Sequence, residues 1–74
     1  MEPLDVAQLA KVRGLTASGA AKAARLGARV TLREVAAASG LGVSTICRYE
    51  RGERVPRGAG ALRYLAVLEG LLAR

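Results

Sequence analysis

Apolar residues recur along this 74-residue chain with the three- and four-residue spacing of helices, and glycines separate the helical stretches. The pattern predicts an all-α fold, a compact bundle of about five short helices. No internal repeat or low-complexity linker interrupts it, so we expect residues 1–74 to form a single domain without a sensor or cleavage domain. The predicted helices cover residues 5–13, 17–28, 32–39, 43–51 and 59–73.

The stretch from Thr31 to Gly52 predicts two short helices joined by a tight turn. Thr31 stands three residues before Glu34, so its hydroxyl can cap a helix that begins at Leu32 while the carboxylate reaches back to the Thr31 amide. Gly40 can adopt the positive φ that ends this helix. One side of the helix carries an apolar stripe about two turns long. The stripe comprises Leu32, Val35, Ala36 and Ser39, whereas Arg33 and Ala37 turn outward.

The second helix of this pair has two different sides. Ile46 and Tyr49 lie on one of them and are expected to face the first helix. The opposite side has no apolar stripe but carries two arginines, which suits a helix that is presented to DNA. That side comprises Val43, Ser44, Cys47, Arg48 and Arg51.

The segment resembles the lambda-repressor-like helix-turn-helix family, of the Cro and XRE type. With Leu32 as the first position of the family motif, Ala36 is fifth, Gly40 ninth, Ile46 fifteenth and Tyr49 eighteenth, and each is a residue type that the family uses there. A small residue at the fifth position lets the helices cross closely, and the glycine makes the turn. The tail ERGERVPRG continues the match. The resemblance implies a transcription regulator that binds double-stranded DNA.

Charge and composition are consistent with that expectation. Twelve basic residues stand against six acidic ones, a net charge of +6 that favours a polyanionic partner. The basic residues Arg48, Arg51, Arg54 and Arg57 are spaced three apart through the second helix and the loop after it.

The cysteine and histidine content argues against a disulfide-stabilised or zinc-binding protein. One cysteine and no histidine leave no intrachain disulfide and no ordinary zinc site, and we expect no cofactor. An enzyme is not expected either, since neither paired carboxylates in a cleft nor a glycine-rich phosphate loop is recognisable. Without a long apolar run or a signal peptide, the chain is expected to be cytoplasmic, in a bacterial cell or a phage-infected host, and to bind no membrane or small molecule.

The resemblance also implies roles for individual residues. Helix-turn-helix proteins place the second helix in the major groove, where its early residues meet base edges. The base-contacting candidates are Val43, Ser44, Cys47 and Arg48; Ser44 could equally cap its own helix, and Cys47 is interpreted as a small filler in preference to a redox sensor. The phosphate-contacting candidates are Arg25, Arg33, Arg51, Arg54 and Arg57, with Lys22 and Arg29 as more distant helpers.

Relatives often pair an arginine of the first family helix with a glutamate of the third, and the same count brings Arg25 opposite Glu50. We predict that pair here. It could be two surface charges, or Glu50 could hold the Arg25 guanidinium toward a DNA phosphate. Both interpretations stay open at this stage.

The helices outside the motif are predicted from apolar spacing and caps. Asp5 can cap the first, with Leu4, Leu9 and Val12 buried, and Gly14 is expected to end it. The helix of residues 17–28 should be capped by Thr16 or Ser18 and should pack across the back of the helix pair, with alanines on its narrow side, Leu26 as its larger buried residue and an end near Gly27. In the loop of residues 53–58, Val55 and Pro56 should tuck inward.

The last helix has an apolar surface that is too wide for one neighbour. Leu62, Leu65 and Leu68 or Leu72 can close the core. Part of the remainder could form a homodimer surface, or the amino-terminal helix could cover it within one chain. The candidates for that surface are Tyr64, Val67, Leu68 and Leu71.

Two functions follow from these features. The first is a sequence-specific repressor, comparable with a phage Cro or a short immunity repressor, that inserts the helix of residues 43–51 in the major groove. The alternative is a protein-interaction adaptor or an antitoxin-type partner that uses the same fold. The residues do not specify the operator sequence or the target genes, nor whether the protein represses or activates transcription.

Overall fold

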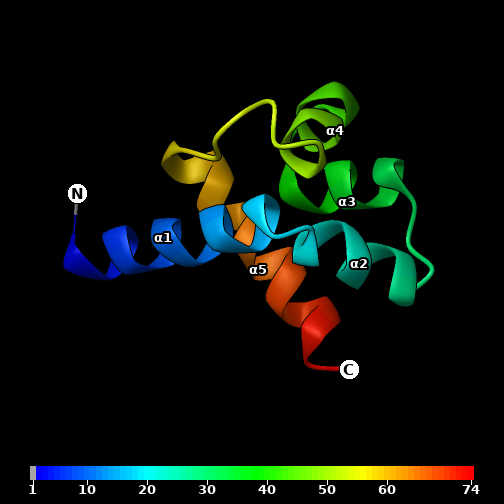
Figure 1. The fold of residues 1–74 in the computed structure, drawn as a ribbon, viewed down its shortest axis with the longest axis horizontal. Helices are drawn as coiled ribbons and strands as arrows, with labels where there is room; N and C mark the ends of the chain where they lie inside the picture. Colours follow the sequence, from blue (N-terminus) through cyan, green and yellow to red (C-terminus); the bar gives the residue numbers. More distant parts are fainter. Residues whose placement is uncertain (1) are drawn as a thin grey trace.

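The computed structural model describes the backbone of residues 2–74 and the side chains of that range other than those of Pro3 and Leu4. Over this range the chain forms five α-helices and no strand, which confirms the all-α prediction (Figure 1). The helices are α1 (Pro3–Ala17), α2 (Ala20–Gly27), α3 (Leu32–Ser39), α4 (Val43–Glu50) and α5 (Gly58–Leu72). None of these helices combines the length with the apolar character that a membrane crossing requires.

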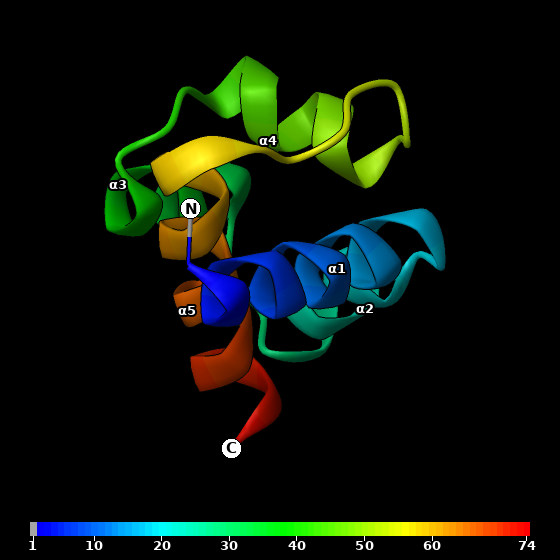
Figure 2. The ribbon, with the colours of Figure 1, turned by 90° about the vertical axis from the view of Figure 1, so that its left-hand side faces the viewer.

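Helix α5 is the element around which the others assemble. It packs against α1, α2 and α3, while α4 packs against α3 and, more lightly, against α1. In both views of the ribbon, α4 lies at one side of the molecule and the carboxy-terminal end of α5 at the other (Figures 1 and 2). The carboxy-terminal end of α5 is therefore remote from α4.

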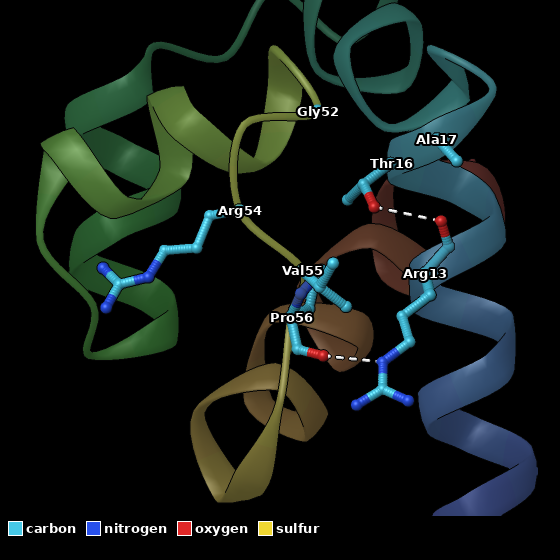
Figure 3. A pocket seen from close by; sticks show the side chains of 7 residues that line it. All are labelled: Arg13, Thr16, Ala17, Gly52, Arg54, Val55 and Pro56. Carbon is cyan, nitrogen blue, oxygen red and sulfur yellow. Dashed lines mark hydrogen bonds between the residues drawn. The ribbon is translucent and has the colours of Figure 1, made fainter.

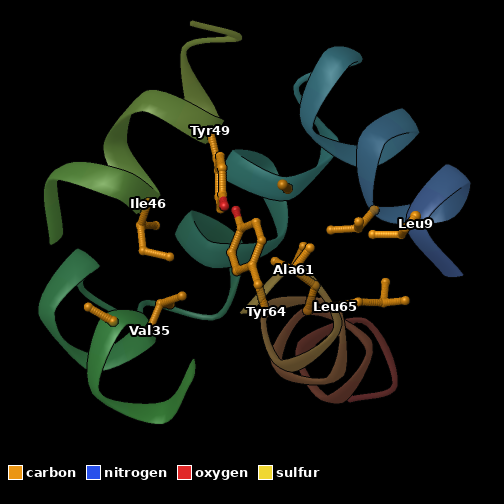
Figure 4. Packing of buried hydrophobic residues seen from close by; sticks show 11 residues of the cluster. Leu9, Val35, Ile46, Tyr49, Ala61, Tyr64 and Leu65 are labelled. Atoms are coloured by element: carbon orange, nitrogen blue, oxygen red, sulfur yellow. The ribbon is translucent and has the colours of Figure 1, made fainter. Parts of the chain in front are cut away.

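The core is filled by side chains from all five helices (Figure 4). Both tyrosines are inside it. The rings of Tyr49 on α4 and Tyr64 on α5 lie 5.3 Å apart between centroids, at 32°, a separation typical of favourable aromatic contacts. The other buried apolar residues are Leu9, Val12, Ala21, Val35, Ala36, Ile46, Ala61, Leu65 and Leu68.

The first helix is longer at both ends than the predicted residues 5–13. It starts at Pro3, with Glu2 as an extended N-cap, so Asp5 lies in the first turn and is not the cap. Gly14 does not end it, because a glycine inside a helix costs only about 1 kcal/mol and buried Val12 and Thr16 hold both sides of that position. The prediction that Leu4 is buried falls outside the described side chains.

The second helix starts three residues later than predicted. Its N-cap is Gly19, whose φ of 84° is readily adopted by glycine, and the Ser18 hydroxyl accepts a hydrogen bond from the Ala20 amide. The end at Gly27 agrees with the prediction. Leu26, however, is 55% exposed and is not a core residue. Helix α2 packs mainly against α1 and α5, and its link to the helix pair is the Arg25–Glu50 ion pair to α4, not a face packed across the back of α3 and α4.

The last helix and the loop before it correct two further expectations. Tyr64 and Leu68 are fully buried, so they cannot form a dimer surface, and α1 packs along α5 as the single-chain alternative supposed. Only Val67 and Leu71 of the four candidates keep partial exposure. In the loop, Pro56 is buried as predicted, whereas Val55 is 54% exposed.

Candidate nucleic-acid interface

The entry into α3 is held by a reciprocal pair of hydrogen bonds. The Thr31 hydroxyl accepts from the Glu34 amide at 3.1 Å, and the Glu34 carboxylate accepts from the Thr31 amide at 2.9 Å. These bonds to Thr31, the backbone one first, lower the pKa of the Glu34 carboxyl. The predicted capping box is thus confirmed, and it fixes the first turn of α3.

The turn between α3 and α4 contains the predicted glycine. Gly40 has φ 71° and φ/ψ values of the left-handed region, which ends α3 in a conformation that glycine adopts without strain. The Leu41 amide donates to the Ala36 carbonyl at 3.1 Å and satisfies one of the last carbonyls of the helix. From α5, Arg63 Nε donates to the Ser39 carbonyl at 2.8 Å. The turn therefore rests on α5 as well as on α3.

Helix α4 has one buried and one exposed side, as the sequence predicts. Ile46 and Tyr49 are 0% and 5% exposed. The N-cap is Gly42 with no side chain bonded to the helix end, so the alternative in which Ser44 caps α4 is wrong. Val43, Ser44 and Arg48 are exposed, and the free thiol of Cys47 is half-buried.

The loop after α4 continues this exposed side. The amides of Gly52 and Glu53 donate to the carbonyls of Tyr49 and Arg48, which closes the end of α4. Arg51, Arg54 and Arg57 are all exposed. The contact between Arg51 and Glu53 is 4.0 Å long and both side chains are more than half exposed, so it does little to restrain Arg51. Arg33 on α3 is exposed too.

Arg25 differs from the other phosphate-contacting candidates because it is buried. Its Nε and Nη2 donate to the two carboxylate oxygens of Glu50, at 2.6 and 3.0 Å, and Nη1 donates to the Val30 carbonyl at 3.1 Å. The hydrogen bond to Glu50 raises the pKa of Arg25. The predicted pair is present, and it is not a pair of surface charges.

The hydrogen bonds divide the arginines into two groups. Arg13, Arg25, Arg63 and Arg74 each donate to another part of the chain. Within residues 2–74, Arg29, Arg33, Arg48, Arg54 and Arg57 have no hydrogen bond or ion pair. The second group, with the loosely held Arg51, lies mostly on the helix pair and its loop, where phosphates could meet it. Sequence spacing gave no sign of the bonds made by Arg13 and Arg63, because their acceptors are 43 and 24 positions away.

A small cavity separates the loop from α1 (Figure 3). It measures about 180 Å³ and is mainly apolar. Arg13 Nε closes one end by donating to the Pro56 carbonyl at 2.8 Å, and the Thr16 hydroxyl donates to the Arg13 carbonyl at 3.0 Å. The Arg54 side chain points away from α1 in Figure 3, toward α3 and α4. The lining residues are Arg13, Thr16, Ala17, Gly52, Arg54, Val55 and Pro56.

The capped α3, the glycine turn and the exposed side of α4 together define a helix-turn-helix unit. A family model described as helix-turn-helix, of the Cro and XRE type, matches residues 22–69, which is more than half of the chain. The chain belongs to this lambda-repressor-like helix-turn-helix family, and membership indicates a DNA-binding transcription regulator. Comparison with curated proteins found no match, and comparison with solved structures found none either. Helix α1 precedes the matched residues.

Proposed function

We propose that this protein is a sequence-specific repressor that inserts α4 in the major groove of double-stranded DNA. The observation that carries the proposal is the division of α4: Ile46 and Tyr49 are locked in the core while Val43, Ser44 and Arg48 stay exposed on a helix held at both ends. A rigidly held helix with free polar side chains suits base reading, because bidentate contacts need fixed geometry.

Each exposed side chain has a proposed task. Arg48 can donate two bonds to guanine O6 and N7, Val43 can contact a thymine methyl, and Ser44 can bond a base edge, with Cys47 filling the space beside them. Phosphates are met by the exposed arginines Arg33, Arg51, Arg54 and Arg57, with Lys22 and Arg29 farther out. Arg25 has two N–H groups left after its three bonds, so a phosphate contact by Arg25 needs the approach of DNA to its exposed edge.

Repression by promoter occupancy fits this architecture. Residues 1–74 would act as one DNA-binding domain, comparable with a phage Cro or a short immunity repressor, in the cytoplasm of a bacterial cell or infected host. No catalytic role, cofactor, membrane or small-molecule ligand enters the proposal.

A homodimer is the proposed binding form. The surface at the end of α5 combines a projecting residue, Leu72, which is 51% exposed, with a shallow groove between α2 and α5. A two-fold axis requires such a self-complementary surface, and Val67 and Leu71 would adjoin it. The groove is lined by Ala24, Gly27, Ala28, Leu71, Leu72 and Arg74.

The same groove favours the second candidate, an adaptor or antitoxin-type protein. A partner protein could occupy it in place of a second copy, because small residues allow close approach of a helix. The two candidates differ in what α4 does: the adaptor needs no sequence discrimination.

Selection of bound duplexes from a random pool tests the proposal most directly. We expect enrichment of a short motif, arranged as an inverted repeat with half-site centres roughly 34 Å apart if a dimer brings both α4 helices to the same side of one duplex. Binding should weaken as salt rises, since phosphate contacts release counterions. A pool that shows no enriched motif at protein concentrations where duplex is bound would reject sequence-specific repression and favour the adaptor. Enrichment of a single half-site would reject the homodimer and leave sequence-specific binding in place.

A further inference from the structure

Two arginines that are absent from the predicted DNA contacts hold the backbone on either side of α4. Arg63 on α5 donates Nε–H to the carbonyl of Ser39, the last residue of α3. Arg13 on α1 donates Nε–H to the carbonyl of Pro56, in the loop after α4 (Figure 3). Both bonds are 2.8 Å long and partly buried. Each therefore ties a supporting helix to a segment that flanks α4.

The Arg63 bond lies at a place where α5 already approaches the turn closely. A Cβ at Gly60 would stand 2.8 Å from Leu41 Cδ2, so the end of the Leu41 side chain would have to shift to admit a larger residue. A Cβ at Gly40 would stand 3.5 Å from Arg63 Nε. The turn before α4 thus lies close to both Gly60 and the Arg63 guanidinium of α5. Loss of the bond would leave the Ser39 carbonyl without this donor and would weaken the attachment of the turn to α5.

The Arg13 bond acts on the loop that carries the exposed arginines. Pro56 is buried, whereas Arg54, two residues before it, and Arg57, directly after it, are exposed. The start of the loop is continuous with α4 through the amides of Gly52 and Glu53. Arg13 fixes the other end, so the loop backbone is held at two points. The backbone positions of Arg54 and Arg57 are restrained as a result.

We propose that Arg13 and Arg63 are positioning residues for DNA recognition, which orient α4 and the loop arginines by holding these two carbonyls and do not themselves bind phosphate. The proposal rests on the proposed DNA-binding function. It assigns part of the +6 charge to internal support. Because a bidentate base contact tolerates little misplacement, a loosened turn should reduce discrimination more than general attraction to DNA.

Charge-preserving and charge-removing variants separate positioning from phosphate contact. Lysine carries a methylene where arginine carries Nε, so Arg13→Lys and Arg63→Lys keep the charge and lose the donor at that place. We expect either lysine variant to lower affinity for the selected duplex by on the order of tenfold and to leave a scrambled duplex unchanged. Arg13→Met and Arg63→Met should also lower affinity for the selected duplex alone, and the slope of log affinity against log salt concentration should stay unchanged. Arg57→Met, the matched control, should reduce that slope by about 1.

Two results would overturn the positioning role. Full affinity in the lysine variants would mean that charge alone matters, and a smaller salt slope in Arg13→Met or Arg63→Met would identify a phosphate contact. Thermal unfolding of each variant shows whether a loss of binding follows from a loss of fold.

Amide hydrogen exchange tests the support without DNA. Arg63→Lys should accelerate exchange at Leu41, and Arg13→Lys at Gly52 and Glu53, while core amides of α5 keep their protection. Unchanged exchange at these amides would contradict the proposal. A wild-type protein that binds no duplex would reject the proposed function and the recognition role together, and accelerated exchange would then show only that the arginines hold the backbone.

Discussion

The Arg25 guanidinium on α2 and the Glu50 carboxylate on α4 form a two-bond ion pair that is almost closed to solvent. The Nε–Oε2 and Nη2–Oε1 distances are 2.6 and 3.0 Å, and the side chains are 10% and 6% exposed. Nη1 also donates to the carbonyl of Val30, next to the residue that caps α3. One side chain thus connects α2, the entry to α3 and the last residue of α4.

Removing the carboxylate should cost far more than removing a surface charge. Glu50→Ala leaves the Arg25 charge buried without its partner, and we expect the free energy of unfolding to fall by about 3 kcal/mol. Urea unfolding followed by circular dichroism measures this loss. DNA affinity should fall as well, because Glu50 is the last residue of α4, the helix that we propose enters the major groove. An unchanged melting temperature together with unchanged affinity would show that the pair has no role.

A double substitution serves as the control. Arg25→Met with Glu50→Met removes both charges, and since apolar replacement of a buried pair is often nearly neutral, the double variant should be more stable than the sum of the two single losses predicts. Strictly additive losses would show that the two side chains act independently.

Arg48 and Arg57 should respond differently to the same substitution. Arg48 lies on the exposed side of α4 and is the proposed base reader, so Arg48→Ala should lose roughly 1 to 3 kcal/mol of discrimination between selected and scrambled duplexes. Arg57→Ala, in the loop, should weaken both duplexes about equally and flatten the salt slope. Titrations at several salt concentrations compare the two. Equal losses on both duplexes for Arg48→Ala would exclude it as the reader.

The motif was readable from sequence because its signals are local. Thr31 and Glu34 are three residues apart, Gly40 acts at its own position, and Ile46 with Tyr49 follows the period of one helix. Each is decided by backbone and neighbours within a turn or two, and the structure bears them all out. The resemblance added the Arg25–Glu50 pair, which no local rule contains.

The sequence-based predictions were wrong where packing between segments that are distant in the sequence determines the structure. The cost of Gly14 inside a helix is too small to end α1 when Val12 and Thr16 are buried beside it. From sequence, Tyr64 and Leu68 are candidates for a dimer surface, because periodicity gives the sides of α5 without saying which helix covers each. In the structure both residues are buried: Tyr64 packs against Tyr49 of α4, and α1 packs along α5.

The capping box offers a test of local stability. Thr31→Ala should lower the free energy of unfolding by about 1 kcal/mol, the usual loss of a threonine N-cap, whereas Thr31→Ser should retain most of it. The pKa of Glu34 is lowered by its bonds to Thr31, so the stabilisation is present above the usual glutamate pKa and is lost as pH falls through the lowered value. An NMR titration should show the pKa of Glu34 rising only part of the way in Thr31→Ala, because the backbone amide of residue 31, the larger cause of the lowered pKa, remains. An unshifted titration would show that the Thr31 hydroxyl does not contribute to the lowered pKa.

Tyr64 should make the protein sensitive to alkali. Burial raises the pKa of Tyr64 to about 12, and within residues 2–74 its hydroxyl has no hydrogen-bond partner. A folded-state pKa above the unfolded one means that the unfolded chain loses the proton first, so stability is full below about pH 10 and falls as pH rises toward 12. Tyr64→Phe keeps the ring contact with Tyr49 and should remove this part of the alkaline loss. It should leave stability at neutral pH unchanged or higher, as chemical unfolding at both pH values would show.

The contact between Gly60 and Leu41 can be measured by a cycle of substitutions. In open helical positions such as Gly14, where a new Cβ meets nothing within 4 Å, glycine to alanine should stabilise by about 0.5 to 1 kcal/mol. At Gly60 the Cβ would press on Leu41 Cδ2 at 2.8 Å, so Gly60→Ala should gain less than Gly14→Ala or lose stability. The end of the Leu41 side chain must then shift. If this shift is transmitted to the turn before α4, DNA discrimination should fall in Gly60→Ala and not in Gly14→Ala.

Truncation of the opposing side chain should remove the conflict. In a Leu41→Ala background there is no Cδ2 to displace, and Gly60→Ala should be clearly more favourable than in the wild-type background. The difference between the two backgrounds, from urea unfolding, is the coupling energy of the close approach. A zero coupling would mean that Leu41 rotates away freely, and that the closeness of α5 to the turn does not hold α4 in place.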